Sequence, residues 1–177
     1  SACFGRDQRR VRFMASHAGV SPDLAWLVAE LALAPFAYLL QCRALPSADA
    51  SPAPSVNAWD RGFCPACGSW PAIIEGAMHG AHLLVCSFCA ARWRLASYRC
   101  VYCGNDTDSF VTAAPDPDRP GRRVQLCGEC GGYAKVLDVA EPIAFPLAAI
   151  EDLASMDLDM IAIERKYLKP PLPDIKR

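Results

Sequence analysis

The sequence predicts an α+β fold with two tandem four-cysteine metal modules, similar to rubredoxins and zinc ribbons, flanked by N-terminal and C-terminal helices. Three observations support this prediction. Eight of the ten cysteines form four Cys-x-x-Cys pairs between residues 64 and 130. Short strand-like segments alternate with these pairs, and alanine- and leucine-rich segments lie on either side. Each module alone is too small for a sufficient apolar core, so metal binding should supply much of its stability, on the order of 10 kcal/mol.

The N-terminal region contains one long helical segment. Ser21 can cap a helix with Pro22 at its first position, and the following apolar run, 24–40, carries a single charge, Glu30. A membrane span needs about 20 apolar residues. Because this run is shorter and is interrupted by Glu30 and Pro35, we expect a buried helix, kinked or split at Pro35, and no membrane span.

The middle of the chain contains an internal repeat. Each copy has a Cys-x-x-Cys turn (a knuckle), a β-hairpin, a second knuckle and a third strand, with turn residues around each strand. The strands expected in the first copy are 70–75, 82–85 and 92–98, and those expected in the second copy are 109–113, 122–126 and 133–139.

The repeat also predicts which cysteines share a metal. Sequential pairing closes each site around one hairpin, whereas a cross-braced arrangement would thread the repeats through each other. We therefore expect Cys64, Cys67, Cys86 and Cys89 to form site 1, and Cys100, Cys103, Cys127 and Cys130 to form site 2. The metal is iron or zinc, between which the sequence does not discriminate.

The residues that follow the knuckles carry a conformational signal. Three knuckles end in glycine (Gly68, Gly104 and Gly131), which suits a positive φ, whereas the fourth ends in Ala90 and should be more strained. His79 and His82 lie between the first two knuckles. We interpret both as polar hairpin residues, because four sulfurs already fill the site.

The C-terminal region predicts a helix over residues 147–166. Ile150, Leu153, Leu158 and Ile161 fall near one stripe, and an acidic side lies opposite. The end of the chain is expected to be extended or disordered. The predicted boundaries are 1–58 for the helical N-terminal region with its linker (46–57), 59–98 for module 1, 99–140 for module 2, and 141–177 for the C-terminal helix and tail.

Charge and composition narrow the function classes. The formal net charge is −1, and eight thiolates with two divalent metals would bring it to about −5. This balance disfavours nucleic-acid binding, which normally needs a basic face. The arginines near the pairs could offset thiolate charge. No catalytic set is evident in the sequence, and four sulfurs leave the metal no open position, so we expect a non-enzymatic protein.

Several side chains near the second and third knuckles are candidates for partner contact. Trp93 and Tyr98 suit either core packing or a partner surface. The candidate partner-binding residues are Arg92, Trp93, Arg94 and Tyr98. Because Ser1–Val20 is basic and lacks the apolar core of a secretory signal, we expect a cytoplasmic protein whose cysteines bind metal rather than form disulfides.

Several segments of the chain resemble a known family, the FdhE-type formate dehydrogenase accessory proteins. The resemblance lies in CPACGSWP (64–71), LLVCSFCAARWRLASYRCVYCG (83–104), CGECGGYAKVLD (127–138), EDLASMDLDMIA (151–162) and GVSPDLAWLVAELALAPF (19–36). It implies a cytoplasmic assembly factor whose two rubredoxin-like modules bind two iron ions. The implied partner is the catalytic subunit of a molybdenum- or tungsten-dependent formate dehydrogenase before export.

The chain departs from the family at both ends. Its N-terminal helical region is shorter than usual, and its tail differs after Glu164. The leading hypothesis is a maturation factor that docks an immature formate dehydrogenase subunit. A rubredoxin-like electron-transfer protein and a zinc-ribbon nucleic-acid module, for which the Arg6–Arg12 cluster is the support, are the alternatives, and a homodimer is left open.

Overall fold

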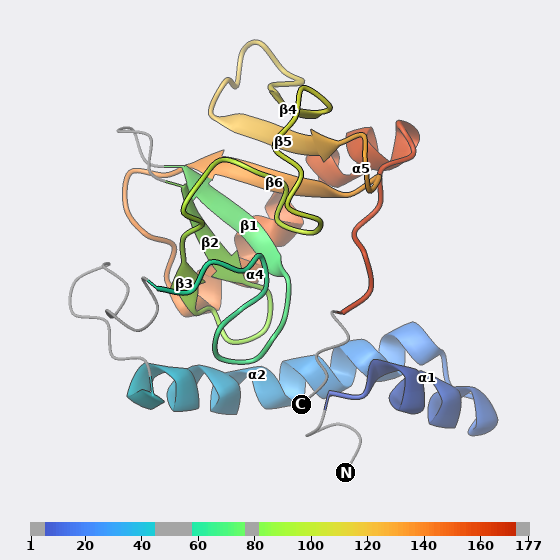
Figure 1. Ribbon diagram of the computed structural model, residues 1–177. Coiled ribbons are helices and arrows are strands. Elements are labelled where there is room, and N and C mark those ends of the chain that lie inside the picture. The colour runs from blue at the N-terminus through green and yellow to red at the C-terminus, as the bar shows by residue number, and fades with distance from the viewer. Residues whose placement is uncertain (1–5, 45–57, 77–81, 173–177) are drawn as a thin grey trace.

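The computed structural model describes residues 6–44, 58–76 and 82–172. Within these residues, two helices precede the sheet and two follow it (Figure 1). The helices are α1 (Gln8–His17), α2 (Pro22–Ala44), α4 (Phe145–Ala154) and α5 (Met156–Glu164). The strands are β1 (Pro71–Gly76), β2 (His82–Cys86), β3 (Arg92–Trp93), β4 (Phe110–Ala113), β5 (Arg122–Cys127) and β6 (Tyr133–Asp138).

The described strands form a six-stranded sheet in the order β3-β2-β1-β6-β5-β4. Strands pair antiparallel within each repeat, and the repeats join through a parallel pair, β1 with β6, in which Ile74 lies opposite Val136. The first strand of one repeat therefore pairs with the third strand of the other, so the repeats follow each other head to tail.

Helices cover both faces of this sheet. Side chains alternate along a strand, so neighbouring residues enter different apolar clusters. Ile74 and Val136 join the cluster against which Leu33, Ala34 and Ala37 of α2 pack. Ile73 and Leu137 join the cluster that contains Leu158 and Ala162 of α5. Burial on both faces explains why β1 is buried at every position.

The predicted strands are confirmed, with one shortened. The strand expected over residues 92–98 contains only Arg92 and Trp93. After Trp93 the chain leaves the sheet, and the backbone N–H of Ala96 donates to the Asp60 carboxylate at 3.0 Å instead of to a neighbouring strand. The α+β fold class with two tandem four-cysteine modules is confirmed. The predicted domain boundaries stay predictions, and the linker 46–57 lies outside the described residues.

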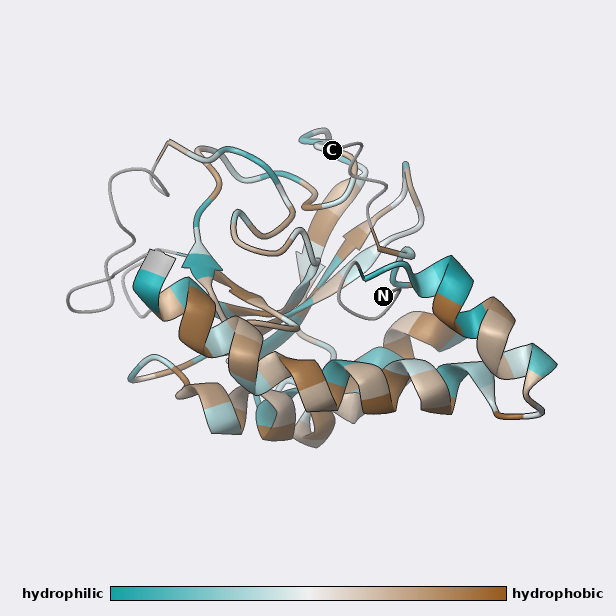
Figure 2. Cartoon of the chain, turned by 90° about the horizontal axis from the view of Figure 1, so that it is seen from below, coloured by the Kyte–Doolittle hydropathy of each residue, from teal (hydrophilic) through white to brown (hydrophobic). Residues whose placement is uncertain are grey.

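Helix α2 differs from its prediction. It runs without a break through Pro35, and it is not buried. Half-buried positions recur every three or four residues, and three of them, Leu33, Ala34 and Ala37, pack against the sheet. Leu27, Leu31 and Phe36 are among the exposed apolar side chains. Figure 2, in which the chain is coloured by hydropathy and seen from below, shows that hydrophobic residues occur along the length of α2. The prediction failed because an almost uniformly apolar run does not mark which side faces solvent.

The same helix is long and apolar enough to cross a membrane, over Pro22–Arg43, and it is the one such helix in the part of the chain that the structure describes. This is weak evidence, because core helices of soluble proteins and signal sequences pass the same test. In this structure α2 packs on the sheet, and its Glu30 binds Arg6. The absence of a membrane span stays a prediction.

The C-terminal region forms two helices instead of the single predicted one. The break falls at Ser155, whose buried hydroxyl donates to the carbonyl oxygens of Glu151 at 2.7 Å and Asp152 at 3.0 Å. Such bonds from a serine to the preceding turn bend helices. The predicted apolar stripe is correspondingly divided, since Leu158 is buried while Ile150 and Leu153 are exposed.

A buried lysine joins the sheet to these two helices. The side chain of Lys135 on β6 is 0% exposed, and its ammonium donates to the Asp152 carbonyl oxygen and the Asp159 carboxylate, both at 2.7 Å. The Asp152 carboxylate lies 2.5 Å away. Lys169 approaches both carboxylates from the surface, and the Tyr133 hydroxyl donates to Asp159 at 2.8 Å. The predicted acidic side is therefore partly paired with cations.

Candidate metal centres

The four knuckles share one backbone pattern. In each, the N–H of the first cysteine donates to the carbonyl oxygen five residues later, at 2.8 to 3.0 Å. These donor–acceptor pairs are Cys64–Ser69, Cys86–Ala91, Cys100–Asn105 and Cys127–Gly132. The common pattern turns both cysteines of each pair to the same side, which is the requirement for a shared ion.

Closing such a turn requires a left-handed residue directly after the second cysteine. Gly68, Gly104 and Gly131 have φ of 76°, 79° and 66°. Ala90 takes the same role with φ 54°, a conformation in which the Cβ atom is crowded. The prediction that the second knuckle is the strained one is confirmed.

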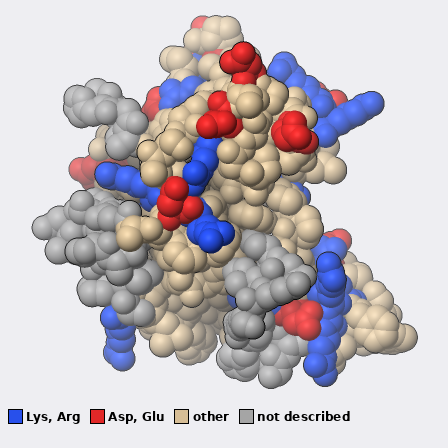
Figure 3. Space-filling model, in the orientation of Figure 1, with Lys and Arg blue, Asp and Glu red and all other residues tan. Residues whose placement is uncertain are grey.

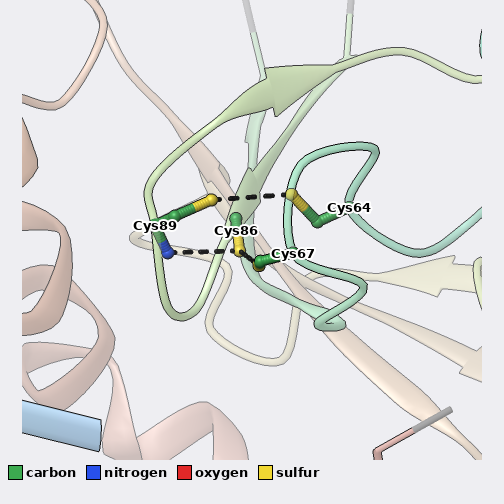
Figure 4. A group of neighbouring side chains, drawn as sticks. All are labelled: Cys64, Cys67, Cys86 and Cys89. Carbon is green, nitrogen blue, oxygen red and sulfur yellow. Dashed lines mark hydrogen bonds between the residues drawn. The ribbon is translucent and has the colours of Figure 1, made fainter. Parts of the chain in front are cut away.

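Site 1 brings together the four cysteines that sequential pairing predicts. The sulfurs of Cys64 and Cys89 lie 3.6 Å apart, those of Cys67 and Cys86 lie 3.4 Å apart, and all four lie within 4.8 Å of one another. Figure 4 shows them converging from the two knuckles. All but Cys67 are buried.

Site 2 has the same arrangement with more contact with solvent. The sulfurs of Cys100 and Cys130 lie 3.7 Å apart, and those of Cys103 and Cys127 lie 3.6 Å apart. Cys103 and Cys130 are exposed, whereas Cys100 and Cys127 are buried. The two centres are therefore alike in geometry and unlike in exposure.

Donors around the sulfurs favour thiolates. The backbone N–H groups of Phe88 and Cys89 point at the Cys86 sulfur at 3.3 and 3.4 Å, and the Asn105 amide points at the Cys127 sulfur at 3.6 Å. Burial raises the pKa of Cys127, but the N–H of Cys130 and the Asn105 amide, among other donors, lower it to about 7.

Without a metal ion, the four thiols of site 1 do not all favour the deprotonated form. Hydrogen bonds from the thiols of Cys64, Cys86 and Cys89 hold the pKa of Cys67 far below its ordinary value, whereas burial raises the pKa of Cys86. One thiolate thus forms at the expense of its neighbours. A divalent cation among the four sulfurs would remove this conflict, since metal binding deprotonates coordinating thiols.

The sulfur spacing fits such an ion. A tetrahedron with metal–sulfur bonds of about 2.3 Å has sulfur–sulfur edges of about 3.8 Å. The paired sulfurs lie at 3.4 to 3.7 Å. Both groups could hold a metal ion, and each consists of cysteines alone among the described residues. His82 lies on β2 outside both groups, and His79 lies outside the described residues.

The arginine that approaches a cysteine sulfur is not one of those that lie near the cysteine pairs in the sequence. Six arginines lie near the pairs in the sequence: Arg61, Arg92, Arg94, Arg99, Arg122 and Arg123. Four of them, Arg92, Arg99, Arg122 and Arg123, pair with carboxylates. The guanidinium that approaches a sulfur belongs to Arg6, whose Nη1 lies 3.9 Å from the Cys67 sulfur. Sequence reasoning missed it because Arg6 is 61 residues away from Cys67 in a basic cluster with no motif.

The four candidate partner residues occupy different environments. Trp93 is wholly buried, and its ring N–H donates to the Arg61 carbonyl oxygen at 2.9 Å. Arg92 binds the buried Glu75 carboxylate through two hydrogen bonds, at 3.0 and 2.9 Å. Arg94 and Tyr98 are exposed. The side chains available to a partner are therefore those of Arg94 and Tyr98.

The charge distribution bears on the nucleic-acid alternative. On the face in Figure 3, acidic and basic side chains are interspersed instead of forming one basic patch. Arg12 of the N-terminal cluster pairs with Asp23, and Arg6 is occupied at site 1. The absence of nucleic-acid binding stays a prediction.

No protein-family model matches the chain. Among curated proteins, the FdhE homologue of Aquifex aeolicus is 32% identical over 116 residues, which cover 63% of this chain and 40% of that protein. The FdhE homologue of Pseudomonas putida is 35% identical over 127 residues, 66% of this chain and 37% of that protein. The chain thus spans about 40% of the length of these relatives.

A solved structure gives the same result. The crystal structure of the FdhE protein from Pseudomonas aeruginosa superposes with a TM-score of 0.52 at 33% identity, covering 63% of this chain and 41% of that one. The resemblance to FdhE proteins that the cysteine motifs indicated is confirmed at the level of both sequence and fold.

Proposed function

From the confirmed resemblance of this chain to FdhE proteins, we propose that it is a non-enzymatic accessory factor in the maturation of a formate dehydrogenase. The observation that carries the proposal is the pair of cysteine tetrads within a chain about one-third identical to FdhE homologues. Its proposed partner is the catalytic subunit of that enzyme.

In this role the tetrads would be structural metal sites that cross-link the knuckles. Site 1 would hold one ion through Cys64, Cys67, Cys86 and Cys89, and site 2 would hold another through Cys100, Cys103, Cys127 and Cys130. When bound, the metal supplies cross-links between the knuckles, and we propose iron in both sites with zinc as the alternative. The thiolates, their N–H donors and the sheet then hold the surrounding surface in one shape.

Exposed side chains near the knuckles and helices provide the proposed docking surface. Arg94 and Tyr98 lie on the segment that connects the two repeats, and the outer side of α2 presents apolar residues. Arginine and tyrosine are enriched among residues that dominate binding at protein interfaces. We therefore assign the first contacts with the partner to Arg94 and Tyr98.

Co-purification tests the proposal. The tagged chain should retain the formate dehydrogenase catalytic subunit, and a variant with Cys100→Ser and Cys103→Ser should lose it. Cys42→Ser is the matched control, because Cys42 is an exposed cysteine on α2 outside both tetrads. Failure of the wild type to retain the subunit, or equal retention by the tetrad variant, contradicts the proposal.

The exposure of Cys103 and Cys130 favours one second candidate, a rubredoxin-like electron carrier. Sulfurs at the surface would bring a redox metal close to an electron donor. This candidate requires a reversible iron couple in voltammetry, and a zinc-only protein with full activity would exclude it.

We further propose a cytoplasmic location, because the tetrads require reduced thiols and thiols stay reduced there. Cell fractionation tests this proposal: recovery of the chain from the periplasm would contradict it. A homodimer remains an open prediction that light scattering would address.

A further inference from the structure

The side chain of Arg6 connects three parts of the molecule at site 1. It lies just before α1, and its guanidinium stacks over the Phe88 ring in the second knuckle, 3.9 Å from the ring centroid. One terminal nitrogen donates to the Ser69 hydroxyl and lies 3.9 Å from the Cys67 sulfur. The other donates to the Glu30 carboxylate on α2. One planar group thus contacts both knuckles of site 1 and the long helix.

The charge of a filled site gives this contact a role. Four thiolates around a divalent ion carry two negative charges, and a charge that is removed from water needs a partner. Site 1 has three buried cysteines, so water provides little compensation. The Arg6 side chain, itself 13% exposed, supplies a positive charge at that position.

Site 2 lacks an equivalent contact among the described residues. Its sulfurs receive donors from backbone N–H groups and from the Asn105 amide, and no lysine or arginine of the described part donates to them. Two of its cysteines are exposed, so water can solvate the charge there. The two centres are therefore stabilised in different ways.

We propose that Arg6 is a positioning residue that holds the metal in site 1 and couples its retention to α2 through Glu30. The inference rests on the proposed metal binding of the tetrads and goes beyond it, since it assigns the retention of one centre to a residue outside every cysteine motif. Any movement of α2 that separates Glu30 from Arg6 would loosen site 1 and leave site 2 unchanged.

The contacts at position 6 require an arginine, because a positive charge alone would not form all of them. An ammonium cannot reach Ser69 and Glu30 at once or stack on Phe88 as a planar guanidinium does. Arg6→Lys should therefore release metal faster than the wild type despite its unchanged charge. Glu30→Leu should also accelerate release, because leucine accepts no hydrogen bond and so breaks the link to α2 while leaving Arg6 in place.

The test follows cadmium, a spectroscopically visible substitute for the native metal, in the full chain. Cadmium NMR resolves the two sites and assigns each through its couplings to the cysteine protons. Loss of each resonance after addition of a chelator then gives a release rate per site. We expect Arg6→Gln to accelerate release from site 1 about tenfold, the effect of one lost charge-assisted hydrogen bond.

Arg12→Gln is the matched control. Arg12 links α1 to α2 through Asp23 and lies in the same basic cluster, but no contact joins it to a described sulfur. It should release cadmium from both sites at the wild-type rate. The site 2 resonance of Arg6→Gln serves as a second control within the same sample.

The outcomes separate this inference from the proposed function. Equal site 1 release by wild type and Arg6→Gln, with both sites loaded, overturns the inference alone. Faster release from both sites in Arg6→Gln overturns it too, because general destabilisation would explain the result. A site 1 release rate equal to that of the wild type in Glu30→Leu or Arg6→Lys overturns the coupling to α2. A wild-type chain that binds no cadmium in either tetrad overturns the proposed function itself.

Discussion

Replacing the buried Lys135 with methionine should destabilise the protein more than any comparable change at its surface. Methionine has nearly the same length and fits the same space, so the loss is that of an ammonium and not of volume. The Asp159 carboxylate, 19% exposed, and the Asp152 carboxylate, 36% exposed, would lose their common partner. The carbonyl of Asp152 at the end of α4 would lose a cation that also suits the helix dipole.

The structure sets the size of the effect. Removing one partner from a fully buried ion pair costs about 3 to 5 kcal/mol. Here both carboxylates keep some access to water, and Lys169 stays 3.4 Å from Asp159, so we expect a loss of about 2 to 3 kcal/mol. Lys169→Met is the matched control. Lys169 contacts the same two carboxylates but is 35% exposed, so its loss should cost about 0.5 kcal/mol or less.

Urea unfolding of the metal-loaded protein at pH 7, followed by circular dichroism, measures both changes. If Lys135→Met lowers the free energy of unfolding no more than Lys169→Met does, the reasoning is refuted, because an apolar side chain would then replace the buried ammonium without cost. A large loss for Lys169→Met would refute it as well, since burial would then not decide the magnitude.

The pH dependence provides an independent check. Burial raises the pKa of Asp159, but the hydrogen bond from Lys135 and the charge of Lys169, together with the Tyr133 hydroxyl, bring it below its ordinary value. A carboxylate with a lowered pKa stabilises the folded state above its unfolded pKa, about 4, and the stabilisation is lost as the pH falls through the folded value. The difference in the free energy of unfolding between wild type and Lys135→Met should therefore have its full size at pH 6 and decrease below about pH 4.

Three further predictions concern the knuckles and the sheet. Ala90 and Gly131 both have positive φ, a conformation that favours glycine. Ala90→Gly should therefore stabilise the protein by about 1 kcal/mol, and Gly131→Ala should destabilise it by about 1 kcal/mol. Thermal unfolding measures both changes in stability. Glu75→Gln should cost about 2 to 3 kcal/mol in urea unfolding, because Arg92 would lose the carboxylate partner of a buried ion pair; an unchanged midpoint contradicts this. Metal removal by a chelator should accelerate amide exchange in the four knuckles before α2, and uniform acceleration would argue against local metal stabilisation.

The sequence predicted the cysteine-rich part well because its constraints are local. Cys-x-x-Cys spacing, the following glycines and the turn residues around each strand all act within a few residues. These local patterns correctly predicted the two tetrads, the strands and the strained position of Ala90. The order of the repeats in the sheet follows from pairing between β1 and β6, and no local signal specifies this long-range contact.

The helical parts were harder to predict for a related reason. The uniformly apolar run of α2 has no pattern that indicates a solvent side, and Pro35 does not interrupt it. The break at Ser155 depends on a hydroxyl that bonds back to its own helix, which composition does not reveal. Arg6 and Lys135 were missed because their roles come from tertiary contacts with residues far along the chain.

The parallel junction between β1 and β6 has a consequence for the use of the two centres. One knuckle of each centre directly precedes β1 or β6, and these strands run in the same direction. Both tetrads therefore lie at the same end of the sheet. The Trp70 and Tyr102 rings, one from each repeat, meet edge to face. An antiparallel junction between β1 and β6 would instead have placed the two tetrads at opposite ends of the sheet.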